Sequence, residues 1–151
     1  MAAPPHTESA REPIREPIRA ATLHPLHAVL LAGGLPLFLG AALSDVAYGK
    51  TYEIQWNNFA SWLIAGGLVF AGLALVWALI DLLRPRRRAH GGVVYAVVMV
   101  LLFVLGFFNA LMHARDAWAS MPAGLVLSVI VTGLAAVAVW LGFRAPVGGP
   151  R

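Results

Sequence analysis

Four long apolar runs constrain this chain more than any other feature. They cover residues 26–43, 59–83, 91–112 and 122–143, and polar segments separate them. At about 1.5 Å per residue, a helix over even the shortest run spans about 27 Å, close to the hydrocarbon core of a bilayer. Strands are excluded because the runs are too long and lack alternation of period two. The runs therefore predict four transmembrane helices.

Composition agrees with lipid as the main solvent. Charged residues make up 12% of the chain, about half the share in soluble domains. Four spans joined by short connections predict an all-α bundle in the membrane, with up-down-up-down order. The chain has no cysteine, which excludes disulfides, thiolate metal sites and thiol catalysis.

Polar segments flank the predicted helical domain, which covers residues 22–143. Residues 1–21 repeat Arg-Glu-Pro-Ile in tandem at 11–14 and 15–18. Proline at every fourth position prevents a regular helix, so we expect a disordered cytoplasmic arm. Residues 144–151, with proline and glycine, are expected to form a disordered tail.

The basic residues predict the orientation. With four spans, both termini and the second connection share one side, which carries nine arginines against only Lys50 and Arg115 on the other. Segments rich in lysine and arginine stay in the cytoplasm, so both termini are expected there. The arginines that would face anionic lipid are Arg11, Arg15, Arg19, Arg84, Arg86, Arg87, Arg88, Arg144 and Arg151. Nucleic acid is not needed to explain the basic charge.

Proline and glycine predict local features of the helices. Pro25 suits the first turn of the first helix, with Thr22 or His24 as the cap. Pro36 predicts a kink in the same helix. Gly66 and Gly67 predict a close approach between the second helix and a neighbour. Residues 44–58 are expected to be a polar connection, whose aromatic residues Tyr48, Tyr52 and Trp56 would form an interfacial belt.

One group of polar residues is predicted at the cytoplasmic ends of the helices: His24, His27, Asp81 and His90. A structural interpretation has His24 capping a helix and His27 bonding Asp81. Alternatively, His27 and His90 could be axial ligands of haem b, with His24 beside them. A divalent metal held by His27, Asp81 and His90 is a third alternative.

A second polar cluster is predicted at the opposite ends: Asp45, Asn58, Asn109, His113 and Asp116. Asn109 and His113 are four residues apart and share a helix face. Ionisable residues in membrane helices are often functional, whereas the structural interpretation has Asn109 bonding a backbone carbonyl. A proton or ion path between the two groups would have only Ser128 and Thr132 at the helix centres.

The sequence also resembles a known family. It opens with Thr-Leu-His-Pro-Leu-His at 22–27, followed by Gly34, Pro36 and a late Asp45. This pattern is similar to the bacterial family catalogued as domain of unknown function 2231, a predicted membrane protein, over about residues 22–143. Four further positions match residues that the family tends to keep: Trp62, Asp81, His90 and Asn109.

The resemblance implies a bacterial inner-membrane protein without an established activity. Some relatives look associated with redox proteins, which implies an electron-transfer or anchoring role. Family members often continue past the fourth helix with Gly-Glu-Leu and a late histidine. Here Trp140 to Phe143 runs into Arg144 instead, so a function that uses those later residues is not expected.

No nucleophile motif, phosphate loop or dinucleotide fingerprint occurs in the sequence, and no catalytic residue is predicted. We therefore expect a non-enzymatic anchoring or assembly subunit, with a redox protein or further copies of the chain as partner. The alternative is a b-haem or quinone-linked electron carrier that uses His27 and His90. A small transporter is the third hypothesis.

Overall fold

The computed structural model describes residues 24–84 and 90–144, with the side chain of His90 excepted. The helices in these ranges are α1 (Pro25–Thr51), α2 (Ile54–Leu83), α3 (His90–His113), α4 (Ala117–Ser120) and α5 (Ala123–Arg144). Four of them are long and apolar enough to cross a membrane, and the described residues contain no strand. The predicted all-α fold with four membrane-length helices is confirmed. The arm expected over 1–21 and nearly all of the expected tail lie outside the described residues.

Helix α1 begins as predicted but ends later. The Nδ1 atom of His24 accepts a hydrogen bond of 3.3 Å from the N–H of Leu26, and Pro25 occupies the first turn. The helix continues through Pro36; the kink expected there remains a prediction. It ends at Thr51 and is capped by Tyr52, which has a left-handed backbone (φ 57°) and donates its N–H to the carbonyl of Tyr48 at 2.8 Å.

The polar connection expected over 44–58 is therefore mostly helical, and only Tyr52 and Glu53 separate α1 from α2. Its polar side chains are compatible with a helix because two of them bond carbonyls one turn back. Ser44 Oγ donates to Gly40 O at 2.8 Å, and Thr51 Oγ1 donates to Ala47 O at 2.9 Å. Hydropathy alone placed the end of the span too early.

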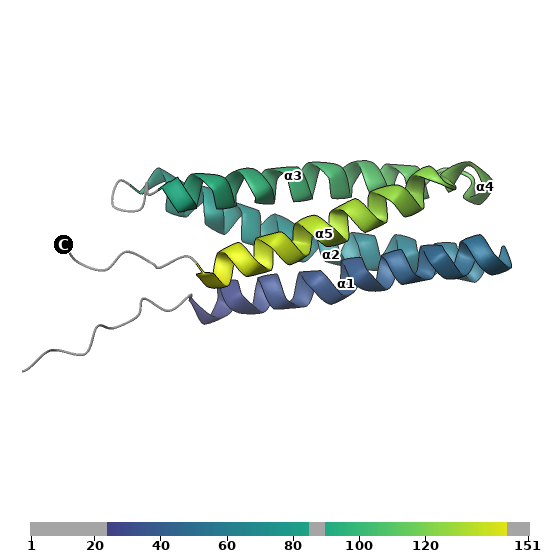
Figure 1. Cartoon of the computed structure of the whole chain (residues 1–151), viewed down its shortest axis with the longest axis horizontal. Helices are drawn as coiled ribbons and strands as arrows, with labels where there is room; N and C mark the ends of the chain where they lie inside the picture. Colours follow the sequence, from purple (N-terminus) through teal and green to yellow (C-terminus); the bar gives the residue numbers. More distant parts are fainter. Residues whose placement is uncertain (1–23, 85–89, 145–151) are drawn as a thin grey trace, which may run out of the picture.

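The four long helices lie alongside one another (Figure 1). Helix α1 packs against α2 and α5, and α3 packs against the same two. The start of α1 and the end of α5 lie at one end of the bundle, while the short helix α4 lies at the other. The apolar core between the four long helices includes Leu31, Phe38, Met99, Leu102, Val131 and Ala135.

Small residues bring helices close together at particular points. A Cβ atom added at Gly67 of α2 would lie 2.8 Å from ring carbons of Phe38 on α1, nearer than two carbons can pack. The close approach predicted at Gly67 is confirmed. Gly133 of α5 differs, because a Cβ there would meet nothing within 4 Å. It faces outward.

Large apolar side chains cover the outside of the helices, as a lipid-facing surface requires. Trp62 and Trp118 are 79% and 75% exposed. Near α4 the rings of Tyr52 and Trp118 stack with centroids 5.6 Å apart, and at the other end Arg144 lies 4.1 Å over the ring of Trp140. Tyr48, expected in the interfacial belt, is buried in the bundle instead.

Candidate functional site

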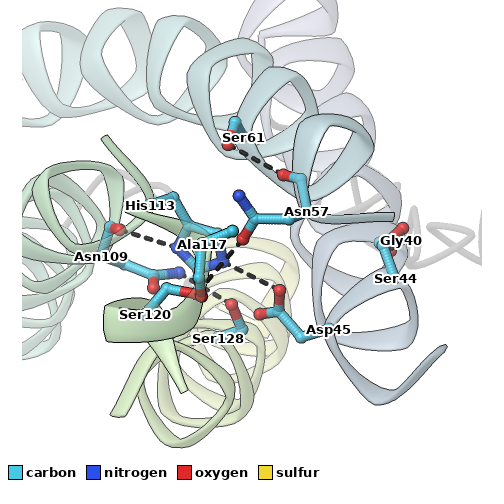
Figure 2. A network of polar contacts seen from close by, with 10 residues as sticks. All are labelled: Gly40, Ser44, Asp45, Asn57, Ser61, Asn109, His113, Ala117, Ser120 and Ser128. Atoms are coloured by element: carbon cyan, nitrogen blue, oxygen red, sulfur yellow. Dashed lines mark hydrogen bonds and ion pairs between the residues drawn. The ribbon is translucent and has the colours of Figure 1, made fainter. Parts of the chain in front are cut away.

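Buried polar side chains gather at the α4 end of the bundle. Figure 2 shows them converging from α1, α2, α3, α4 and α5. We call this group the distal cluster; its members are Asp45, Asn57, Asn109, His113, Ser120 and Ser128. Each of these side chains is buried. The centre of the cluster is a histidine with a polar partner on each ring nitrogen.

His113 is held on both sides of its ring. Its Nδ1 atom lies 2.9 Å from the carbonyl oxygen of Asn109, one turn earlier in α3. Its Nε2 atom lies 2.8 Å from Oδ1 of Asp45 on α1. On α5, a Cβ atom added at Gly124 would lie 2.9 Å from Cε1 of the same ring. The glycine therefore lets the imidazole rest against the start of α5.

Asn109 and Ser128 extend the cluster to the facing helix. The Nδ2 atom of Asn109 donates to Ser128 Oγ at 2.9 Å. The expected bond from Asn109 to a backbone carbonyl is thus replaced by a bond to a hydroxyl. Asn109 Oδ1 and Asp45 Oδ2 are buried and have no hydrogen-bond partner in the described part of the chain. The distal cluster therefore contains two buried acceptor oxygens without a hydrogen-bond donor among the described residues.

Helix α4 covers this end of the bundle with a hydroxyl of its own. Ser120 Oγ donates to Ala117 O at 2.6 Å and contacts Asn57 Oδ1 of α2 at 3.3 Å. The short helix was not predicted. Its sequence offers little signal, because four residues hold barely one turn.

The structure brings together Asp45, Asn109 and His113 of the second predicted group. Asn58 and Asp116 are exposed and do not join them. Asn57 takes the buried position because it lies on the face of Ala60 and Ile64, which are also buried. That spacing of three and seven residues is the signal that could have selected Asn57 over its neighbour.

Three members of the first predicted group, His24, His27 and Asp81, lie at the other end. Together with Trp77 and Tyr95, which the structure adds, we call them the proximal cluster. The Nε2 atom of His27 lies 2.8 Å from the hydroxyl of Tyr95 on α3, in place of the expected bond to Asp81. The rings of His24 and His27 lie against Trp77, with centroids 4.8 and 5.8 Å away. Asp81 pairs with Arg84 at 3.4 Å. Sequence reasoning missed Tyr95, which looks like one more aromatic residue in an apolar run.

No three potential metal ligands gather among the side chains that the structure describes. In the predicted set of His27, Asp81 and His90, the side chain of His90 lies outside the described residues. His27 Nδ1 is buried without a hydrogen-bond partner in the described residues.

The middle of the bundle separates the two clusters. A cavity of about 10 Å³ lies there, lined by apolar residues that include Leu31, Phe38, Met99 and Ala135. This volume is about the smallest that holds one water molecule. Thr132, one of the two polar residues at the helix centres, donates its hydroxyl to the carbonyls of Phe38 and Ser128 at 3.0 and 2.7 Å.

Comparison with known proteins places the chain in a family. No curated protein and no solved structure matches it significantly. The family described as "Predicted membrane protein (DUF2231)" matches residues 23–147, a range that contains both clusters and all four membrane-length helices. The chain belongs to this family of predicted membrane proteins, as the opening His-Pro-Leu-His stretch indicated.

Proposed function

We propose that the protein is a small polytopic protein of the bacterial inner membrane that anchors or assembles with a partner and has no enzymatic activity of its own. The observation that carries this proposal is the tight packing of the bundle interior in the described part of the chain. The cavity in the middle of the bundle measures about 10 Å³, whereas pockets for small-molecule ligands measure roughly 300–1,000 Å³. Binding to a partner through the outer helix faces requires no interior space.

A redox protein is the first partner to test, because the family resemblance implies such an association. The electron-carrier alternative has less support from the described residues. Nε2 of His27 contacts Tyr95, and a ligand on Nδ1 would have to fit inside the packed end of the bundle. The transporter alternative needs a polar path, yet Phe38, Met99 and Val131 fill the middle.

Mass spectrometry of the complex tests the anchoring role. The full chain, released from native membranes in mild detergent, is expected to carry a second subunit or further copies above its own 16.1 kDa. A redox partner would show the mass of a flavin, haem or iron–sulfur protein. Harsher detergent should release the 16.1 kDa chain alone and serves as the control. A monomer in every mild preparation would exclude the proposal.

The proposed topology is up-down-up-down with both termini in the cytoplasm. It is supported by charge, because Arg84 follows α2 and Arg144 is the last residue of α5, whereas Lys50 and Arg115 belong to the opposite end. Positive residues favour the cytoplasmic side.

Reporter fusions check this orientation. We expect a fluorescent protein fused after Arg151 to fluoresce and alkaline phosphatase at the same position to be inactive. A truncation after Asp116, in the turn between α3 and α4, should give the reverse pattern. Active phosphatase after Arg151 would overturn the orientation.

A further inference from the structure

The proposed anchoring role makes no use of the buried pair of Asp45 and His113, whose geometry points to chemistry of its own. We propose that these two residues form a binding site for one exchangeable proton, held between Asp45 Oδ1 and His113 Nε2. The two atoms lie 2.8 Å apart and belong to different helices (Figure 2). Both side chains are fully shielded from solvent.

The other ring nitrogen fixes how many protons the pair holds. His113 Nδ1 faces the carbonyl oxygen of Asn109 at 2.9 Å, and a carbonyl can only accept. Nδ1 therefore carries a hydrogen. The remaining contact joins Nε2 and a carboxyl oxygen, which would repel each other at 2.8 Å if both presented lone pairs. One proton must lie between them, and the pair is then neutral overall.

The bare oxygen of Asp45 indicates where this proton rests. Asp45 Oδ2 is buried without a partner in the described residues, and so is the acceptor Asn109 Oδ1 in the same cluster. A bare oxygen on an ionised carboxylate costs more free energy than the bare carbonyl oxygen of a neutral carboxyl group. The proton therefore rests on Asp45 Oδ1 and is donated to His113 Nε2.

The separation also selects a proton over a metal ion. Zinc bonds nitrogen and oxygen at about 2.0–2.2 Å with tetrahedral angles, which sets these two atoms roughly 3.3 Å apart. The observed 2.8 Å is a hydrogen-bond distance. A proton fits between the two atoms without any further space.

The site can exchange its proton with water because it lies at the end of a helix. His113 is the last residue of α3, and Ala114 and Arg115 after it are exposed. On release, the O–H bond of Asp45 breaks, its electron pair stays on Oδ1, and the proton passes to water. The carboxylate then faces the Nε2 lone pair, so the ring must turn or the helices must separate. Proton release is thereby linked to a change in structure.

Few other titratable groups act on this pair. Asp45 is the titratable side chain that interacts with His113 among the described residues. From α1, Tyr48 is buried one turn after Asp45. The other elements contribute amide and hydroxyl groups that do not titrate near neutral pH: Asn57 from α2, Ser120 from α4 and Ser128 from α5. Arg115 and Asp116 are exposed on the turn that follows α3.

Magnetic resonance of the full chain in lipid bilayers tests the proposal. With ¹³C on the aspartate carboxyl groups and ¹⁵N on the histidine rings, spectra are recorded from about pH 4 to about pH 9, which brackets the ordinary pKa values of both groups. The chain has three aspartates, Asp45, Asp81 and Asp116. We expect the carboxyl of Asp45 and the ring of His113 to change together, at one midpoint and with one proton per chain.

Three variants assign the signals and control for folding. D45N removes the titratable oxygen but keeps a donor to Nε2, and H113Q removes the ring; each should abolish the shared midpoint. D116N changes an exposed aspartate close to the site and should leave the midpoint in place. Signals of Asp45 and His113 that stay constant over the whole range, or that titrate at separate midpoints, would refute the shared proton.

Discussion

Replacing Gly67 by valine is expected to destabilise the bundle by about 1–3 kcal/mol, the usual cost of overpacking a core. A Cβ atom at this position would lie 2.8 Å from two ring carbons of Phe38 and 3.0 Å from a third. Phe38 is 1% exposed, and a Cβ at Gly106 would also contact it, at 3.8 Å. The ring has little room to move away, so α1 and α2 must separate.

The matched control is Gly133→Val, which makes the same substitution on an outward helix face. Nothing lies within 4 Å of a Cβ there, and a change of at most about 0.5 kcal/mol is expected. Helices in a membrane form before they pack, so the helix propensity of valine enters both folded and unfolded states and cancels. Unfolding in mixed micelles with increasing dodecyl sulfate measures both variants.

Equal stability of the two variants would mean that Gly67 does not set the distance between α1 and α2. The double variant G67V/F38L refines the result. A smaller, flexible side chain opposite the valine should restore part of the lost stability, because the two residues share one contact.

Hydropathy predicted the number and kind of helices because lipid imposes length and composition on any span. It failed at the ends of the helices, where polar side chains form hydrogen bonds with backbone carbonyls of their own helix. Ser44 and Thr51 look like connection residues in the sequence, yet both lie in α1 with their hydroxyls on carbonyls one turn earlier. Hydropathy does not include such bonds, so the end of α1 was predicted eight residues too early, at residue 43 and not at Thr51.

For the candidate site, the sequence predicted which end of the bundle each residue lies at, but not which side chains meet there. The sequence placed Asp45, Asn109 and His113 at the same end of the bundle, but rotation about each helix axis decides which side chains meet. One residue corresponds to about 100° of rotation. This is the difference between buried Asn57 and exposed Asn58, and the sequence-based prediction selected Asn58.

The distal cluster gives the second large effect, which a double-mutant cycle measures. Asp45→Val leaves Nε2 of His113 without its partner, and His113→Leu leaves the carboxyl of Asp45 bare. Each change is expected to cost about 1–3 kcal/mol, because a buried polar group loses its hydrogen bond. Asp45→Asn should cost less than Asp45→Val, since the amide N–H can still donate to the ring.

The double variant D45V/H113L decides what the pair contributes. The double variant removes both polar groups, so that neither is left buried without a hydrogen-bond partner. It should therefore be more stable than the sum of the two single effects implies. Hydrogen bonds between membrane helices contribute about 0.6 kcal/mol on average and up to about 1.7, and the fully buried 2.8 Å contact belongs at the upper end. Additive effects would show that the two side chains are neighbours without a shared bond. That result would remove the structural basis of the proton site as well.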